Sequence, residues 1–390
     1  MRSNGDQQTA MLKGFSKVIA ASLLGLAALS AQAQSYLMYV GTYTDHTASK
    51  GIYAFSYDAN AGRFDPLGLA AETKDPSFLA ASSDGRFLYA VNELSDFEGK
   101  KSGAVSAFRV DPGTGKLAFL NQVASRGADP CYIAFDKSGR YLLVANYSGG
   151  NVAALPVDPD GRLREAAGFV QHSGSGANKE RQEGPHAHWI ETSPDNRFAL
   201  AADLGLDELI VYHFEPNSGE LAANGYGKVN AGSGPRHAAF SRNGKFVYLL
   251  NEMKGTVTVF RFDKGKLNEV QSIESLPRDF SGSNDAAELV MHPSGRFLYA
   301  SNRGEDAIVV FRVDQKKGTL QVVERSSTQG KTPRSFAIDP DGKLLLAANQ
   351  NSNNIVVFRI DASTGHLTPT GQKLDAPAPV CVVFVKRKTN

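Results

Sequence analysis

The segment Gly295-Arg296-Phe297-Leu298-Tyr299-Ala300-Ser301-Asn302 decides the fold, because the chain repeats its pattern about every fifty residues. In each repeat a turn residue is followed two positions later by a large apolar residue and seven positions later by asparagine or aspartate. The turn position holds Gly85, Gly139, Asn196, Gly244, Gly295 and Gly342. The later position holds Asn92, Asn146, Asp203, Asn251, Asn302 and Asn349. The runs between them are short, aromatic and β-branched, which predicts a β-strand in every repeat.

A second strand is predicted after each asparagine or aspartate, as in residues 256–260, 307–311 and 354–358. A Gly-x-Leu turn then follows at Gly115, Gly161, Gly219, Gly265, Gly318 and Gly365. Beyond residue 33 no stretch keeps an apolar period of 3.6 residues, so we expect almost no helix.

These units have the size of one β-propeller blade. A four-stranded sheet cannot bury both faces alone, whereas sheets stacked around an axis can. Beside the six repeats, residues 36–69 supply three strands of a further unit, and residues 379–385 read as its missing first strand. We therefore expect an all-β, seven-bladed propeller with four antiparallel strands per blade. The C-terminal strand is expected to join the N-terminal blade and close the ring.

The first 33 residues are predicted to be a secretory signal peptide. Lys13 and Lys17 precede the apolar run of residues 18–29, and Ala31-Gln32-Ala33 has the small-x-small pattern of a signal-peptide cleavage site. The apolar run is too short to span a bilayer. We expect cleavage after Ala33, a single propeller domain over residues 34–390, and a periplasmic or secreted protein without membrane contact.

The net charge of the chain limits the classes of partner that it can bind. The chain has a formal net charge of +2, and residues 1–33 contain three basic residues and one acidic residue, so their removal leaves about zero. Nucleic acid is therefore not an expected partner, because proteins that bind phosphate backbones carry an excess of basic residues. The two cysteines, Cys131 and Cys381, fall on non-adjacent predicted strands, so we expect two free buried thiols. We expect a monomer.

Two columns of residues are predicted to meet on one face, because the first strand of a blade starts where the antiparallel second strand ends. One column holds Ser77, Cys131, His188, Arg236, Ala287 and Arg334. The other column adds Glu93, Asn146, Glu252 and Arg303. His186 shares a side of its strand with His188, and Glu288 is one step out of the first column. The polar residues 174–183 are expected to lie over this face as a rim or lid.

These residues allow more than one interpretation. The asparagines are most simply turn residues that hydrogen-bond backbone groups. Three arginines on one face of a neutral protein repel one another unless an anion lies among them. Glu93, Glu252 and Glu288 could supply that charge in a purely structural network, or the face could bind an anionic ligand. The two histidines could pack together or bind a metal, but no third ligand shares a recognisable spacing, so no metal is expected.

Four motifs on this face are Arg181-Gln182-Glu183-Gly184-Pro185-His186-Ala187-His188, Gly234-Pro235-Arg236-His237, Asn251-Glu252 and Asn302-Arg303-Gly304. With them, residues 36–385 resemble the seven-bladed propeller lactonase family, which includes a 6-phosphogluconolactonase and a fungal carboxy-muconate lactonising enzyme. Ala187 departs from the proline that the family often has there. The resemblance implies a catalytic set of one histidine, two arginines and a glutamate, and no cofactor. The matching residues are His186 or His188, Arg236, Glu252 and Arg303.

We favour His188 because it shares a column with Arg236, and we expect substrate contacts from His186, Glu288, Arg334, Glu93 and Asn146. Glu252 or His188 would take a proton from water and the other would protonate the leaving ring oxygen. Arg236 and Arg303 would stabilise the oxyanion or hold an anionic group.

The prediction is therefore a carboxylic-ester hydrolase that opens a sugar-acid lactone, with an anionic or polyhydroxylated small molecule as substrate. Export would separate such an enzyme from cytoplasmic 6-phosphogluconolactone, so its lactone is expected to arrive from outside. Two alternatives stay open. One is a muconate-type lactonising cycloisomerase, and the other is a non-catalytic propeller that binds a carbohydrate or a protein.

Overall fold

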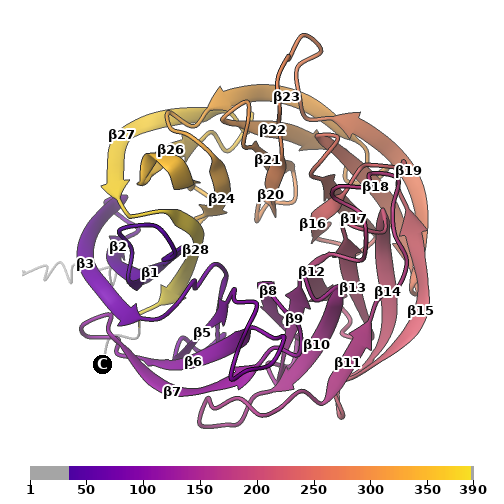
Figure 1. The fold of residues 1–390 in the computed structure, drawn as a ribbon. Helices are drawn as coiled ribbons and strands as arrows, with labels where there is room; N and C mark the ends of the chain where they lie inside the picture. The colour runs from indigo at the N-terminus through magenta and orange to yellow at the C-terminus, as the bar shows by residue number, and fades with distance from the viewer. Residues whose placement is uncertain (1–34, 388–390) are drawn as a thin grey trace, which may run out of the picture. The chain divides into compact units, whose positions relative to one another are not determined.

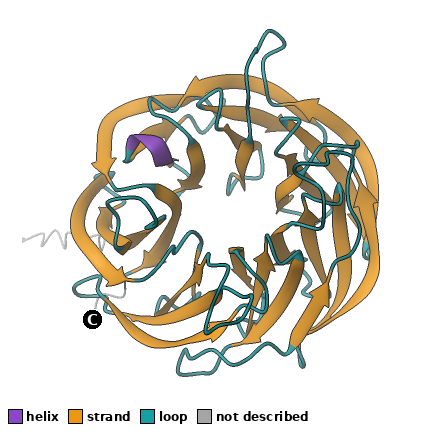
Figure 2. Ribbon diagram, in the orientation of Figure 1, coloured by secondary structure: helices purple, strands orange, loops and turns teal. Residues whose placement is uncertain are grey.

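The computed structural model describes residues 35–387, in which seven four-stranded antiparallel sheets surround a central axis (Figure 1). The predicted signal peptide lies outside the described residues. The seven-bladed, all-β prediction is confirmed. Strands and loops make up almost all of the described chain (Figure 2). The one helix in residues 35–387, η1 (Gln350–Ser352), has three residues, and no helix there has the length and hydropathy of a membrane span.

Each sheet forms one blade, whose strands run in order from the axis outward. Blade 1 contains β28 (Pro379–Lys386), β1 (Ser35–Thr42), β2 (Gly51–Asp58) and β3 (Arg63–Glu72). Blade 2 contains β4 (Leu79–Ala81), β5 (Phe87–Asn92), β6 (Ala104–Val110) and β7 (Leu117–Ala124). Blade 3 contains β8 (Pro130–Phe135), β9 (Tyr141–Asn146), β10 (Asn151–Pro156) and β11 (Gly168–Gln171).

The remaining four blades repeat this order. Blade 4 contains β12 (Ala187–Thr192), β13 (Phe198–Asp203), β14 (Glu208–Glu215) and β15 (Glu220–Lys228). Blade 5 contains β16 (Pro235–Phe240), β17 (Phe246–Asn251), β18 (Thr256–Asp263) and β19 (Lys266–Glu274). Blade 6 contains β20 (Ala286–Met291), β21 (Phe297–Asn302), β22 (Ala307–Val313) and β23 (Leu320–Ser327). Blade 7 contains β24 (Pro333–Ile338), β25 (Leu344–Asn349), β26 (Asn354–Ile360) and β27 (Leu367–Asp375).

The ring closes as predicted. The C-terminal strand β28 pairs with β1 in an antiparallel register that runs from Tyr36 opposite Lys386 to Thr42 opposite Pro379. Because the two ends of the described chain share blade 1, neither end leaves an unpaired inner sheet edge.

The turn that starts each second strand needs a left-handed backbone, which explains the repeated glycine. Gly295 has φ 68° and Gly139 has φ 72°. Blade 4 has Asn196 at this position, with φ 59°. Asparagine is one of the few side chains that tolerate this region, so the exception follows the same rule.

The core lies between the blades. Every residue of β5, β9, β13, β17, β21 and β25 is buried. The ring of Phe246 in blade 5 packs against Gly318 in blade 6, where an added Cβ would stand 2.3 Å from the ring. The absence of a Cβ at this hairpin glycine therefore allows the ring to pack closely against the neighbouring blade. Burying such a side chain contributes about 1.5–3 kcal/mol to stability.

The two thiols are also as predicted, since Cys131 and Cys381 are both free and buried.

Candidate active site

A bulge at the start of the inner strand places the first column of predicted residues. The pairing register of β8, β12, β16, β24 and β28 with the second strand skips one residue, and that of β20 skips two. The skipped residues include Cys131, His188, Arg236 and Arg334. A bulge takes a residue out of the ladder and re-aims its side chain. Six of the seven blades therefore carry a bulge at the same end of the inner strand, whereas β4 of blade 2 pairs with β5 without a register shift.

The carboxylate of Glu252 binds three arginines. Glu252 follows β17, and its Oε1 accepts a hydrogen bond of 2.6 Å from Nη2 of Arg181. Its Oε2 lies 2.8 Å from Nε of Arg236 and 2.9 Å from Nη2 of Arg303. We call Arg181, His188, Arg236, Glu252 and Arg303 the polar cluster. The structure brings the predicted residues Arg236, Glu252 and Arg303 into contact and adds Arg181, which the sequence did not indicate. Burial lowers the pKa of His188, and this ring is near enough to Arg236 for the guanidinium charge to lower that pKa further.

Two donors of the polar cluster have no hydrogen-bond acceptor in the described part of the chain. Nε of Arg236 and Nη2 of Arg303 are close enough to Glu252 for ion pairing, but neither N–H is directed at an acceptor within the described residues. Nη1 of Arg236 donates to the carbonyl oxygen of Ala287, which fixes the guanidinium. An unsatisfied buried donor is costly, so these two N–H groups are suited to an oxygen of a ligand.

The polar cluster sets the charge of its members. Burial alone raises the pKa of Glu252, but Arg303, Arg236 and Arg181 reverse the effect and bring this pKa to about 2. Burial lowers the pKa of Arg303 to about 10, against the opposing effect of Glu252. Burial, with Arg236 and His237, lowers the pKa of His188 well below 6.5. At neutral pH the cluster therefore holds one carboxylate, three guanidiniums and a neutral imidazole, a net charge of +2.

His188 and His186 differ in what their rings contact. Both ring nitrogens of His186 have partners, because Nδ1 is 3.1 Å from the Tyr147 carbonyl oxygen and Nε2 is 3.2 Å from Glu183. The imidazole of His188 meets the rings of Tyr147 and His237 edge-on, with centroids 5.5 and 5.2 Å apart. Among residues 35–387, the one side-chain polar partner of the His188 ring is the Cys131 sulfur, 3.6 Å from Nδ1. This arrangement favours His188 for proton transfer.

Arg334 and Glu93 form a second charged group beside the polar cluster. The hydroxyl of Tyr43 lies 3.0 Å from both oxygens of Glu93, and the Arg334 guanidinium lies over the Tyr43 ring at 5.2 Å. Burial alone lowers the pKa of Arg334, but Tyr43, Glu93 and Glu252 together raise it. Arg334 is therefore a permanent cation that acts electrostatically on the polar cluster.

Two predicted contacts lie elsewhere. The carboxylate of Glu288 is 2.7 Å from Nδ1 of His237 and accepts a hydrogen bond of 3.2 Å from Ser335. It lines a cavity further along the inner strands. Asn146 is fully buried, and its amide nitrogen donates to the Ser125 carbonyl oxygen and to Asn151. These bonds fit the structural interpretation of the repeated asparagines, in which their side chains hydrogen-bond nearby groups at the strand end.

The loop that carries Arg181, residues 172–186, is held at both ends by a buried aspartate. Oδ2 of Asp203 is 2.5 Å from Nδ1 of His172, whose Nε2 is 2.5 Å from the Tyr212 hydroxyl. Oδ1 of Asp203 accepts a hydrogen bond of 2.8 Å from the backbone N–H of His186. In the middle of the loop, the buried Gln182 donates to the Leu204 carbonyl oxygen. The sequence placed this loop over the site but carried no sign of which residue would reach Glu252.

Comparison with known proteins identifies the family of the chain. The chain matches the family model described as lactonase, 7-bladed beta-propeller, over residues 37–384. It is 36% identical to a 6-phosphogluconolactonase of Bacillus subtilis, covering 90% of this chain and 98% of that protein. A 6-phosphogluconolactonase of Formosa agariphila is also 36% identical, over 77% of this chain and 86% of that protein.

A solved structure leads to the same result. The periplasmic gluconolactonase of Pseudomonas aeruginosa superposes with a TM-score of 0.84 at 36% identity, covering 91% of this chain and all of that one. The resemblance seen in the four sequence motifs is confirmed, and the chain belongs to the seven-bladed β-propeller lactonase family.

Proposed function

We propose that the protein hydrolyses a sugar-acid lactone at the polar cluster. The observation that carries the proposal is the excess positive charge around Glu252, with two buried N–H groups that lack an acceptor. Such donors stabilise the oxyanion that forms when water adds to a carbonyl carbon. The relatives named 6-phosphogluconolactonase and gluconolactonase support a lactone as substrate.

In the proposed reaction Arg236 and Arg303 bind the lactone carbonyl oxygen. His188, neutral because burial lowers its pKa, removes a proton from the attacking water. The bond between the carbonyl carbon and the ring oxygen then breaks, and the imidazolium returns the proton to that oxygen. The product is a hydroxy acid, whose carboxyl group ionises at neutral pH.

In this proposal Glu252 acts neither as a general acid nor as a general base. With a pKa of about 2 it is a weak base and carries no proton to donate near neutral pH. Its part is to hold Arg181, Arg236 and Arg303 together despite their mutual repulsion. Arg181 is the most accessible member of this set, with 39% of its side chain exposed.

The remaining charged groups suit an anionic or polyhydroxylated substrate. Arg181 and Arg334 supply further cations at the edge of the polar cluster, and Glu93 supplies an acceptor for hydroxyl groups. His186 is proposed as an additional contact. We also propose that the active unit is a monomer.

We further propose that the enzyme is exported. The signal-like residues 1–33 support this, as does the relative named as periplasmic. Mass spectrometry of the mature N-terminus after expression in a Gram-negative host tests it, with Gln34 as the expected first residue. An intact N-terminus in the soluble cell fraction would contradict export.

Kinetics on matched lactones test the proposed activity. Glucono-δ-lactone and its 6-phosphate are offered to the wild type, to Arg236→Gln and to Arg242→Gln, which changes an exposed arginine. Loss of an oxyanion donor should lower kcat/KM by about 10²–10³-fold, whereas the control should stay near wild type. Full activity in Arg236→Gln would rule out the site.

The same experiment separates the two alternatives. Turnover of a carboxy-muconate without turnover of any lactone would favour the cycloisomerase. Saturable binding of sugars without turnover of either substrate would favour the non-catalytic propeller.

A further inference from the structure

A second cavity lies along the axis, beyond the polar cluster. It occupies about 640 Å³ and extends along the inner strands, from residues near their starts, such as Tyr132 in β8 and Ser335 in β24, to residues near their ends, such as Phe240 in β16 and Met291 in β20. The polar cluster lies at the start of these strands, so the cavity begins beside it and extends towards the opposite side of the propeller. Its volume is within the range of small-molecule sites.

Aromatic rings separate the cavity from the polar cluster. Phe78 and Tyr132 line the cavity with ring centroids 4.3 Å apart. Both meet the ring of His237 at 5.8 and 5.2 Å, and the other neighbour of His237 is His188. These rings lie between the cavity and His188, so a ligand of the cavity would contact them and not His188 directly.

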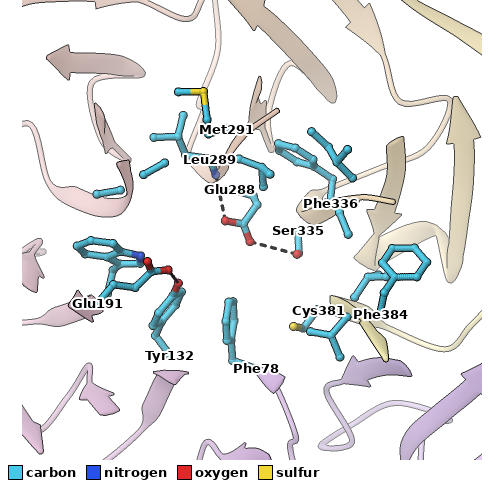
Figure 3. Close-up of a pocket in the computed structure, with 18 of the residues that line it drawn as sticks. Phe78, Tyr132, Glu191, Glu288, Leu289, Met291, Ser335, Phe336, Cys381 and Phe384 are labelled. Carbon is cyan, nitrogen blue, oxygen red and sulfur yellow. Dashed lines mark hydrogen bonds between the residues drawn. The ribbon is translucent and has the colours of Figure 1, made fainter. Parts of the chain in front are cut away.

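The walls are mostly apolar and aromatic. Figure 3 shows Phe78, Tyr132, Phe336 and Phe384 around one space, with Glu191 and Glu288 on different sides of it. The rings of Trp189 and Phe240 also line it. Such walls favour a ligand with an apolar body, because aromatic surface gains most from burial.

The charged groups of the cavity are mainly acidic. Glu191 accepts a hydrogen bond of 2.7 Å from the Tyr132 hydroxyl and takes part in no ion pair within residues 35–387. Glu288 has His237 as its ion-pair partner, and burial lowers the pKa of this imidazole, which makes it a neutral donor. Lys137 is the one cationic side chain in the lining, and it is exposed at the rim.

These two carboxylates also affect each other. Burial raises the pKa of Glu191, and the charge of Glu288 raises it further, while Lys137 and the Tyr132 hydroxyl oppose the rise. A cation placed in the cavity would relieve this repulsion. An anionic ligand would increase it, and a neutral ligand would leave it unchanged.

We infer that the cavity binds a small organic cation, an ammonium group attached to an aromatic or branched apolar body. The ammonium contacts the Glu191 carboxylate and the faces of the surrounding rings, as ammonium ions do in aromatic sites. The apolar body fills the space between the inner strands. The inference does not depend on lactone hydrolysis, and a failure of either proposal leaves the other untouched.

The only tryptophan of the chain, Trp189, lies in this cavity and reports on it directly. Tryptophan fluorescence is titrated with benzyltrimethylammonium, with benzyl alcohol and with phenylacetate, which share a ring and differ in charge. We expect saturable quenching by the cation at millimolar concentration or below, and weaker quenching by the other two. Glu191→Gln should weaken binding of the cation about tenfold, and the exposed Glu220→Gln should not change it.

Several results would overturn the inference. One is the absence of saturable quenching in the wild type, and another is equal affinity for the cation and the neutral analogue. Unchanged affinity in Glu191→Gln would do the same. If that variant fails to fold, Phe384→Leu removes a ring of the wall at similar volume, and cation affinity that is unchanged in this variant would also contradict the inference.

Discussion

Glu252→Gln is the substitution whose effect the structure defines best. The three arginines lower the pKa of the buried Glu252 from 4.5 to about 2. At 1.36 kcal/mol per pKa unit, this difference corresponds to about 3 kcal/mol of folding free energy. A carboxyl group whose pKa is depressed on folding contributes this stability above its unfolded value and loses it as pH falls through the folded value. The contribution should therefore be complete above about pH 5 and vanish towards about pH 2.

Denaturant unfolding followed by Trp189 fluorescence measures the effect. The wild type should be more stable than Glu252→Gln at pH 7, since the variant leaves three guanidiniums without their carboxylate. The stability difference should shrink by about 3 kcal/mol as pH falls from about 5 to about 2. Glu220→Gln, which changes an exposed glutamate, should show no such trend. A difference that is the same at every pH, or a variant more stable than the wild type at pH 7, would refute the reasoning.

Three further predictions concern the same face. His188→Gln should lower kcat by about 10²–10⁴-fold. Because the pKa of His188 is well below 6.5, wild-type kcat/KM should stay level from about pH 8 to about pH 6, and a midpoint near 6.5 would contradict its assignment as the base. Burial lowers the pKa of Arg303 to about 10, so calorimetry should show weaker binding of the product hydroxy acid above that pH, and equal affinity at about pH 8 and about pH 11 would argue against this contact. Asp203→Asn should release the loop of residues 172–186, so that trypsin cleaves after the exposed Lys179 faster than in the wild type; equal cleavage rates would show that Asp203 does not hold the loop.

The sequence was sufficient for the fold because each repeat carries its own turn chemistry. The left-handed residue at Gly295 and its equivalents, Asn196 included, marks where every second strand starts. The unaccompanied C-terminal strand could have one partner, the incomplete N-terminal blade, and β28 does pair with β1. Local rules of this kind can be read without knowing tertiary contacts.

The site was only partly predictable. Residues that stand in a repeat column, such as Arg236 and Glu252, could be brought together by counting. The bulge that re-aims Arg236 leaves no mark in the sequence, because it arises from the pairing of two strands. Arg181 belongs to a loop outside the repeat, so its contact with Glu252 depends on how that loop folds.

The cavity beyond the polar cluster had no sequence signal of its own. Its lining includes runs of consecutive residues in the inner strands, such as Ala238 to Phe240, which are as apolar as the core residues beside them. Glu191 resembles an ordinary solvent-facing residue in the sequence, and only its hydrogen bond to Tyr132 shows that it turns toward the axis. The substrate contacts expected from Glu288 and Asn146 illustrate the same limit, because Glu288 lies one step from a column and Asn146 lies within one, and both side chains bind other protein groups.

A crystal structure of the wild type soaked with 6-phosphogluconate, the hydroxy acid expected from a phosphorylated lactone, tests the central claim most directly. We predict that its carboxylate accepts hydrogen bonds from Nε of Arg236 and Nη2 of Arg303, the two N–H groups without an acceptor, with His188 next to the carboxyl carbon. A carboxylate bound away from these arginines, or a hydroxy acid bound only at the opposite face of the propeller, would contradict the assignment of the polar cluster as the active site.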